Sequence, residues 1–286
     1  MKRSSFSVVT INLNMAPFLG RTIESVLSNL RPGDEYFVID GGSSDGSLAV
    51  LKTYEGKITG WVSEKDSGYA EALRKGFGKC SGDFFCWVNS GDLLLPGALD
   101  VAREMLNSSG VDLLMGDDLH IDESDVVLRQ SRGGVPFFKQ MMLFGPWTPL
   151  QDACFWTKSL YLSIGGIDPG LRYAADYAFF LRAAWAGQVR YVPVVFSAFR
   201  RHQGQKSIAN AAAYKHEQNV VRRSVLENVH YSRWRALLWR MSCWFFVRLR
   251  HYLLQRLFST WIPAGSRVQE IRAAFRRESN DRSDQA

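Results

Sequence analysis

Short apolar runs alternate with amphipathic segments along the first part of this chain, and this alternation constrains the fold more than any other feature. The runs have the length of buried strands, and the segments between them have helical periodicity. Strands are expected at 7–13, 36–39, 58–62 and 84–88, and helices at 14–29, 47–53, 69–77 and 98–106. Such alternation is typical of βαβ units, so the sequence predicts an α/β fold with a largely parallel sheet.

The pattern changes after residue 116. The remaining elements are expected to be short strands at 113–116 and 126–128, helices at 137–144 and 176–185, and an apolar, β-branched run at 189–199. The last run is expected to return to the sheet. An acidic run lies between Asp117 and Asp125. We interpret this run as a solvated loop.

Three successive strands of the predicted sheet end in acidic turns. Asp40 and Asp45 follow the second strand, Asp66 the third and Asp92 the fourth. Parallel strands place these turns at one edge of the sheet, where open α/β sheets bind ligands. Crowded carboxylates repel one another, so the cluster favours a bound cation or polar ligand. Read as local structure alone, the same residues are ordinary turn formers and helix caps.

Several common functional classes are excluded by missing motifs. The turn after the first strand has no glycine until Gly20, so the dinucleotide-binding fingerprint is absent, and so is a phosphate-binding P-loop. The four cysteines form no Cys-x-x-Cys pair, which argues against zinc and against a disulfide framework. The start of the chain lacks the apolar stretch of a signal peptide, which predicts a cytoplasmic protein.

The net charge of +7 arises entirely from the end of the chain. Residues 231–286 carry 11 arginines against four acids, whereas residues 1–230 carry 24 basic and 24 acidic side chains. Tryptophans and arginines interleave over 234–262, which suits a helix lying at a membrane surface. No uncharged stretch there is long enough to span a bilayer. Alternatively, this segment packs on the rest of the protein or forms a homo-oligomer interface. The same residue types could bind nucleic acid, but nothing else in the sequence indicates it.

The sequence resembles the family 2 glycosyltransferases of the GT-A fold over roughly residues 5–205. The resemblance rests on seven segments in the family's order, namely Val9–Asn14, Val38–Ser47, Ser63–Gly68, Asn89–Asp92, Leu150–Phe155, Gly165–Asp168 and Ala175–Tyr177. It implies a Rossmann-like, three-layer α/β sandwich with a mostly parallel central sheet over residues 1–210. A helical extension is expected at 211–275 and a disordered tail at 276–286.

The resemblance also implies roles for individual residues. Asp176 is expected to be the catalytic base, although it also suits a helix cap. The residues expected to bind the nucleotide sugar are Thr10, Asn12, Asn14, Asp40, Asp45, Asp66, Lys75, Asn89, Ser90 and Asp92. A divalent cation, Mn²⁺ or Mg²⁺, is expected at Asp92 and His202. His202 can also be interpreted as a solvated surface residue. Asp117 or Asp118, and the loop of Gln151 and Asp152, are expected on the acceptor side.

The chain departs from the family pattern at three places. Gly91 stands where many relatives have a first acid, Ile11 replaces a proline, and no Gln-x-x-Arg-Trp motif follows the base. The last departure argues against processive synthases. The resemblance therefore implies metal-dependent, inverting transfer of one sugar from a nucleotide diphosphate donor, taken to be a UDP-sugar.

The expected acceptor is a glycan or a lipid-linked molecule in surface polysaccharide biosynthesis, reached at the inner face of the cytoplasmic membrane. The alternative function is a non-catalytic scaffold that binds nucleotide sugars, which Gly91 favours.

Overall fold

The computed structural model describes residues 4–108, 110–135, 138–202, 210–229, 232–257 and 265–268. Its strands are β1 (Phe6–Asn12), β2 (Glu35–Asp40), β3 (Gly60–Ser63), β4 (Phe84–Trp87), β5 (Leu93–Leu94), β6 (Leu113–Ile121), β7 (Val127–Ser131), β8 (Cys154–Thr157) and β9 (Val189–Arg200). Its helices up to β9 are α1 (Ala16–Leu27), α2 (Ser47–Thr53), α3 (Tyr69–Lys79), α4 (Ala98–Asn107), α5 (Phe138–Phe144), the short 3₁₀ helix η1 (Gln151–Ala153), α6 (Lys158–Ser163) and α7 (Ala175–Ala186).

The strands form one curled sheet in the order β3-β2-β1-β4-β8-β6-β9-β5, with β7 paired to β6. The neighbours β3, β2, β1 and β4 run parallel, as the alternation of strands and helices predicts. Beyond β4 the sheet is mixed, because β8 runs antiparallel to both β4 and β6. Further along, β9 runs parallel to β6, and β5 runs antiparallel to β9. The predicted α/β fold is confirmed, with an all-parallel first half and a mixed second half.

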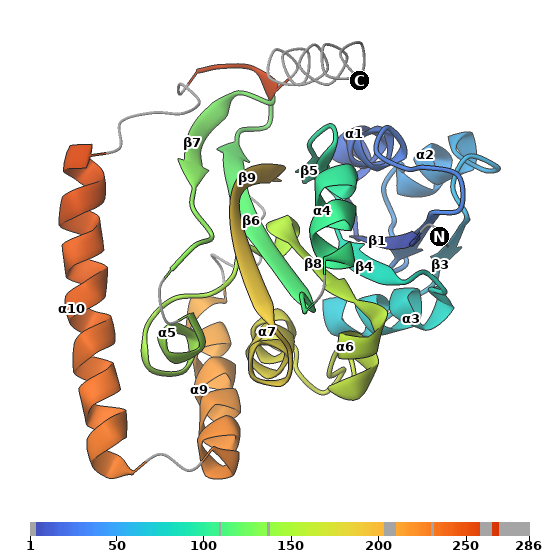
Figure 1. The fold of residues 1–286 in the computed structure, drawn as a ribbon. Coiled ribbons are helices and arrows are strands. Elements are labelled where there is room, and N and C mark those ends of the chain that lie inside the picture. Colours follow the sequence, from blue (N-terminus) through green and yellow to red (C-terminus); the bar gives the residue numbers. More distant parts are fainter. Residues whose placement is uncertain are drawn as a thin grey trace.

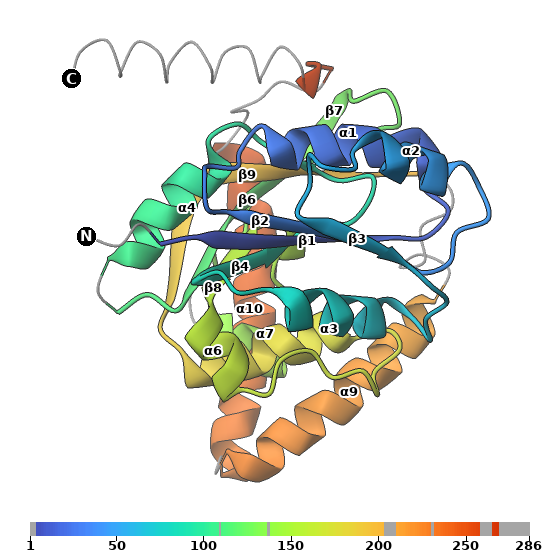
Figure 2. The same ribbon diagram turned by 90° about the vertical axis from the view of Figure 1, so that its right-hand side faces the viewer.

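Helices cover both faces of the sheet (Figures 1 and 2). α1 and α2 lie on one face, and α3, α6 and α7 lie on the other. The core under α7 is aromatic: Trp156 packs its ring 5.2 Å from that of Trp87 and 4.9 Å from that of Phe179. These rings are at most 1% exposed. Their burial fixes α7, and therefore Asp176 at its start, against the centre of the sheet.

The interpretation of 117–125 as a solvated loop is wrong at both ends of the run. Asp125, at its far end, is buried and pairs with Arg21 and Arg200. Asp117 and Asp118 lie inside β6 and are at most 2% exposed. The side chain of Asp117 accepts hydrogen bonds from the Gly133 N–H at 3.0 Å and the Tyr191 hydroxyl at 2.9 Å. Partners 16 and 74 residues away thus compensate the charge, and neither is visible from the local sequence.

Two further helices follow β9. α9 (Ala211–Asn228) contacts α7, and α10 (Arg233–Leu257) packs on α5 at the outside of the molecule (Figure 1). The chain then returns to the body, where Val268 is buried beside Leu93 and Ile121. The proposed boundary at residue 210 therefore separates parts that touch. The predicted tail at 276–286 lies outside the described residues.

Candidate active site

The loops after β1 and β2 are joined by the Ser43 hydroxyl. It accepts hydrogen bonds from the Asn14 backbone N–H at 2.8 Å and from the Asn12 side-chain amide at 3.2 Å. It donates to Asp40 at 2.5 Å, and the Asn12 amide also donates to Asp40, at 2.6 Å. Asn14 has a φ of 54°, a conformation that asparagine adopts more readily than most residues. Three of the predicted nucleotide contacts therefore meet at one point.

Asp40 is the centre of this network and has no exposed surface. Its carboxylate also accepts a hydrogen bond from the Ser63 hydroxyl at 2.6 Å, which ties in the end of β3. Burial raises the pKa of Asp40, but the hydrogen bonds from Ser43, Ser63 and Asn12 outweigh this effect and lower the pKa overall. Asp40 is thus a fixed, ionised anchor for three strand ends, and its contact with the nucleobase stays a prediction.

Thr10 and Asp45 are occupied by structural contacts. Thr10 is fully buried, and its hydroxyl lies 2.9 Å from the hydroxyl of Tyr36. Asp45 accepts the backbone N–H of Ala16, the first residue of α1, and that of Ser47, the first of α2, both at 2.9 Å. One carboxylate therefore caps two helices. The nucleotide-binding roles of both residues stay predictions.

The third acidic turn lies against the second. Asp66 accepts the Gly68 N–H at 3.0 Å, and its carboxylate would be only 2.8 Å from a Cβ placed on Gly41. A side chain at Gly41 would displace Asp66, which explains the glycine in this turn. Lys75, on α3, forms ion pairs of 2.9 Å with Glu64 and Glu71. Its predicted contact with the donor stays a prediction.

The turn after β4 is supported from several elements. Asn89 donates to Asp92 at 3.2 Å and to the side-chain oxygen of Gln151 at 2.8 Å. Gln151 in turn donates to the Trp87 carbonyl at 2.9 Å, and the Ser90 N–H donates to the Ile11 carbonyl at 3.0 Å. Gln151, expected on the acceptor side, thus also braces the turn that carries Asp92.

Gly91 has a φ of 106°, a backbone conformation that other residues adopt only with strain. The glycine at this family-atypical position therefore has a structural reason. Its carbonyl accepts a hydrogen bond of 2.8 Å from the side chain of Arg200, and the Arg200 backbone N–H donates to Asp92 at 2.9 Å. Arg200 is 1% exposed and also pairs with Asp125.

Asp92 belongs to a group of buried carboxylates together with Asp118 and Asp152. All three are at most 5% exposed, and the side chain of Asp152 accepts a hydrogen bond of 2.8 Å from Ser197. Burial raises the pKa of all three carboxyls, and the charge of Asp152 raises those of Asp92 and Asp118 further. Among the described residues, the Asp118 Oδ1 atom has no hydrogen-bond partner. Ionising all three carboxyls together would place excess negative potential at this end of the sheet.

A cation suits this potential, but the described residues hold no set of three or more His, Cys, Asp or Glu side chains placed to ligate one. The hydrogen bonds to Asp92 leave part of its acceptor capacity unused, since a carboxylate has about four lone-pair sites. His202 follows β9 two residues after Arg200, and its ring centroid lies 6.3 Å from that of Phe18. The metal-binding roles of Asp92 and His202 therefore stay predictions.

Asp176 lies in the first turn of α7, on the side of the sheet covered by α3. Its carboxylate accepts the Tyr177 N–H at 2.7 Å. The Tyr69 hydroxyl lies 3.3 Å from the Asp176 carboxylate and 2.9 Å from the Tyr173 carbonyl, so its one proton is shared between these two acceptors. Tyr69 begins α3 directly after the Asp66 turn, so this hydroxyl links the predicted donor loop to the predicted base. Burial raises the pKa of Asp176 to about 6. Above that pH the group is a carboxylate that can accept a proton.

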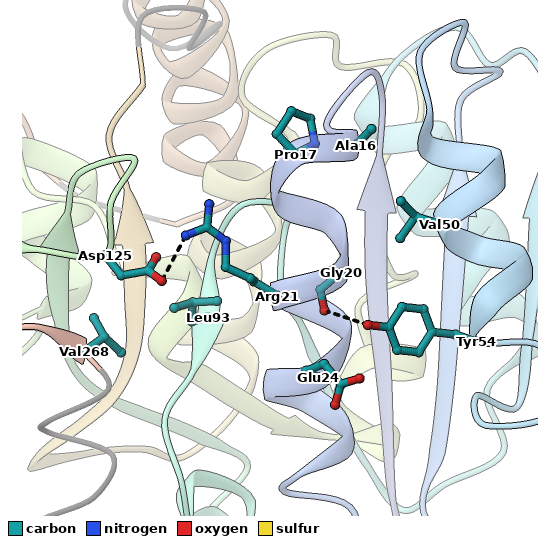
Figure 3. Close-up of a pocket in the computed structure, with 10 residues that line it drawn as sticks. All are labelled: Ala16, Pro17, Gly20, Arg21, Glu24, Val50, Tyr54, Leu93, Asp125 and Val268. Carbon is teal, nitrogen blue, oxygen red and sulfur yellow. Dashed lines mark hydrogen bonds and ion pairs between the residues drawn. The ribbon is translucent and has the colours of Figure 1, made fainter.

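A pocket of about 390 Å³ lies elsewhere, between α1, α2 and the turn before β7 (Figure 3). Arg21 points across it toward Asp125, at 3.0 Å, and the Tyr54 hydroxyl donates to the Gly20 carbonyl at 3.4 Å. None of the predicted site residues lines this pocket.

Sequence reasoning missed three residues that hold the site: Tyr69, Arg200 and Glu217. Arg200 ends an apolar strand and Tyr69 starts a helix, and these positions gave no local signal that either side chain reaches the site. Glu217 lies in α9, in a segment that was assigned to the extension, and its carboxylate accepts the backbone N–H groups of Tyr173 and Ala174 just before α7.

The comparisons with known proteins identify the family of this chain. The family described as glycosyl transferase family 2 matches residues 7–160. An uncharacterized glycosyltransferase of Mycobacterium tuberculosis is 36% identical over 181 residues, covering 62% of this chain and 68% of that protein. A PGL/p-HBAD biosynthesis glycosyltransferase of Mycobacterium bovis is 24% identical over 213 residues, covering 71% and 80%. This chain belongs to glycosyl transferase family 2, and it is a glycosyltransferase.

Solved structures show the same fold. S. aureus TarS 1-349 in complex with UDP-GlcNAc has a TM-score of 0.65 at 14% identity, covering 89% of this chain and 76% of that one. The mannosyltransferase PcManGT from Pyrobaculum calidifontis, in complex with GDP-Man and Mn²⁺, has a TM-score of 0.59 at 12% identity, covering 98% and 80%. The GT-A fold predicted from the sequence is confirmed.

Proposed function

We propose that this chain transfers one sugar from a UDP-sugar onto a glycan or lipid-linked acceptor in surface polysaccharide assembly, with inversion at the anomeric carbon. The observation that carries the proposal is the Tyr69 contact, which joins the Asp66 turn to the Asp176 carboxylate. TarS binds UDP-GlcNAc and PcManGT binds GDP-Man, which supports a nucleotide-sugar donor. Of the two nucleotides, we propose UDP.

Asp176 would act as the general base. The acceptor hydroxyl oxygen forms a bond to the anomeric carbon while its proton passes to the Asp176 carboxylate. The bond from that carbon to the phosphate oxygen breaks, and its electron pair leaves with the nucleoside diphosphate. Attack and departure on opposite faces give one displacement with inversion. The raised pKa of Asp176 suits this role, because a base titrating near the working pH transfers protons well.

Asp92 and His202 would hold Mn²⁺ or Mg²⁺ together with the donor diphosphate. Bound there, the cation neutralises charge on the leaving diphosphate. Hard cations of this kind take oxygen ligands such as the carboxylate of Asp92. PcManGT, which has a similar fold, binds Mn²⁺ with its donor, and this likeness supports metal dependence.

Replacing Asp92 with asparagine is expected to weaken UDP binding about tenfold when Mn²⁺ is present, and to leave the metal-free affinity unchanged. The loss follows from removing one charged ligand of the ion; tenfold corresponds to about 1.4 kcal/mol. Isothermal titration calorimetry with UDP, with and without Mn²⁺, checks it. Asp100→Asn on the exposed face of α4 is the matched control. Equal Mn²⁺-dependent affinity in wild type and Asp92→Asn would contradict the metal role.

The non-catalytic alternative predicts a different result in the same material. A scaffold would bind UDP but would not cleave a nucleotide sugar to produce UDP. A donor-hydrolysis assay that follows the calorimetry separates the two functions, because binding without any turnover supports the scaffold.

We also propose that α10 contacts the inner face of the cytoplasmic membrane. Six large apolar residues share its exposed face, with exposures of 47–76%: Trp234, Leu237, Leu238, Met241, Trp244 and Phe245. The opposite face of α10 packs on α5, where Cys243 is buried. Arg248 stacks on Trp244 at 4.1 Å, and this end of the chain carries the positive charge that anionic lipids attract. No helix of the described residues is long and apolar enough to cross a membrane.

Met241→Glu is expected to reduce binding to phosphatidylglycerol-containing vesicles about tenfold, because it places a negative charge at the centre of the apolar face. Co-sedimentation with vesicles measures the effect. Ser242→Glu adds the same charge on the neighbouring side of the helix and should bind within about twofold of wild type. Failure of the wild type to bind anionic vesicles would contradict the proposal, and a dimer lost in Met241→Glu would assign the face to a homo-oligomer.

A further inference from the structure

The helix that carries Asp176 begins without a cap of its own. The residue before α7, Ala174, has no side chain that can accept a hydrogen bond from the first turn. The N–H groups at a helix start lack partners within the helix and need acceptors from elsewhere. The first turn of α7 finds its acceptors in the Tyr69 hydroxyl of α3 and in the Asp176 carboxylate itself. The backbone N–H groups of the three residues before the helix find theirs in α9.

The acceptor from α9 is the Glu217 carboxylate. It accepts the backbone N–H groups of Arg172 at 3.1 Å, Tyr173 at 2.8 Å and Ala174 at 2.8 Å. A carboxylate at this place also faces the positive end of the α7 dipole. Hydrogen bonds to an ionised acceptor are about twice as strong as neutral ones. One side chain, 41 residues beyond Asp176, therefore fixes the segment that leads into the base.

The acceptor from α3 is the Tyr69 hydroxyl. It accepts the N–H of Ala175 at 2.7 Å and lies 3.3 Å from the N–H of Asp176. Arg222 of α9 makes a second contact with α7, because it donates to the Tyr177 hydroxyl at 2.8 Å. It also donates to the Gly145 carbonyl, after α5, at 2.8 Å. α9 thus holds α7 on both sides of Asp176 in sequence.

We propose that Glu217 is a positioning residue for the transfer reaction, holding the start of α7 so that Asp176 meets the acceptor hydroxyl in the productive geometry. The inference rests on the proposed role of Asp176 as base. It makes α9, which lies beyond the residues matched by the family, part of the catalytic apparatus.

Glu217 also acts on Asp176 through its charge. The pKa of Asp176 is raised first by burial and in addition by the negative charge of Glu217. Within the part of the chain that the structure describes, Tyr69 from α3 and Tyr214 from α9 also face Asp176. Removing the charge of Glu217 lowers the pKa of Asp176, so the acidic limb of the pH–rate profile moves to lower pH. A purely structural cap would leave that limb in place.

The test compares Glu217→Ala, Glu217→Gln and a matched control, Glu227→Gln, which removes the same charge from an exposed position of α9. We expect Glu217→Ala to lower kcat about tenfold, with the KM for the UDP-sugar within about twofold, because small misplacements of a catalytic group are costly. Glu217→Gln retains an acceptor oxygen and should recover most of kcat while its acidic limb shifts down. Glu227→Gln should match wild type in both.

Two further measurements keep the outcomes distinct. Hydrogen–deuterium exchange of the 172–176 amides needs no substrate, and it should accelerate in Glu217→Ala and stay slow in Glu227→Gln. Unchanged exchange, or an unchanged kcat and acidic limb in both Glu217 variants, would overturn the inference. Turnover retained in Asp176→Asn would instead remove the base assignment, and it would leave the exchange result to decide whether Glu217 holds the start of α7.

Discussion

Asp176→Asn is expected to lower kcat for sugar transfer about 10³-fold, since a positioned general base contributes 10²- to 10⁴-fold. Asparagine has the same shape, and its Oδ1 atom can still accept the Tyr177 N–H that now bonds Asp176 at 2.7 Å. It has no basic site for the acceptor proton. Donor affinity should therefore stay within about twofold of wild type, because Asp176 enters the reaction only on the acceptor side. Product formation at saturating donor measures the loss.

The pH dependence gives this prediction a second readout. Burial raises the pKa of Asp176 to about 6, so the wild-type rate should fall as the pH drops through that value and the base becomes protonated. The residual activity of Asp176→Asn should lack this limb. A variant that keeps both the rate and the limb would exclude Asp176 as the base.

Arg200→Met is expected to lower the free energy of unfolding by about 3–5 kcal/mol, the range found when one partner of a buried ion pair is removed. The Arg200 guanidinium bonds the carbonyls of Gly91 and Asp122 and pairs with Asp125, and methionine replaces none of these donors. Urea denaturation followed by tryptophan fluorescence measures the change.

Arg190→Met provides the control, since Arg190 is exposed on the same strand and should change stability by less than about 0.5 kcal/mol. Equal stability of the two variants would contradict the structural role of Arg200. The Gly91–Asp92 turn should also loosen in Arg200→Met, because the guanidinium holds the Gly91 carbonyl.

The sequence predicted the parallel half of the fold closely. α2 spans Ser47–Thr53, as its periodicity indicates, and the strands up to β4 end within two residues of the predicted positions. Local pattern suffices there, because each strand is apolar on both faces and each helix has one apolar side. The antiparallel strand β8 was missed because it has only four residues. Its aromatic residues favour a strand, but so short a run shows no periodicity, and its pairing with β4 and β6 is long-range.

Individual site residues could be predicted from the sequence, but most of the hydrogen bonds that connect them could not. Asn12, Asn14 and Asp40 were expected together, and Ser43 joins them in the structure. The double cap made by Asp45 could not be foreseen, because it depends on the α1 start lying beside the β2 loop.

The positions of Asp118 and Glu217 could not be predicted either, because they depend on long-range contacts. The burial of Asp118 in β6 and the reach of Glu217 to the start of α7 join elements far apart in the chain. Residue type alone made the first look like a solvated acid and the second like part of a separate extension.

The central claim is that this family 2 glycosyltransferase breaks a nucleotide-sugar bond with the aid of a cation and Asp176. The most direct measurement is nucleoside diphosphate release from a panel of UDP-sugars and GDP-sugars, with Mn²⁺ or with EDTA, by wild type and by Asp176→Asn in the presence of acceptor. We predict Mn²⁺-dependent release by wild type from at least one donor, stimulated by acceptor, and loss of that stimulation in Asp176→Asn. Tight UDP binding with no release from any nucleotide sugar, GDP-sugars included, would contradict the account.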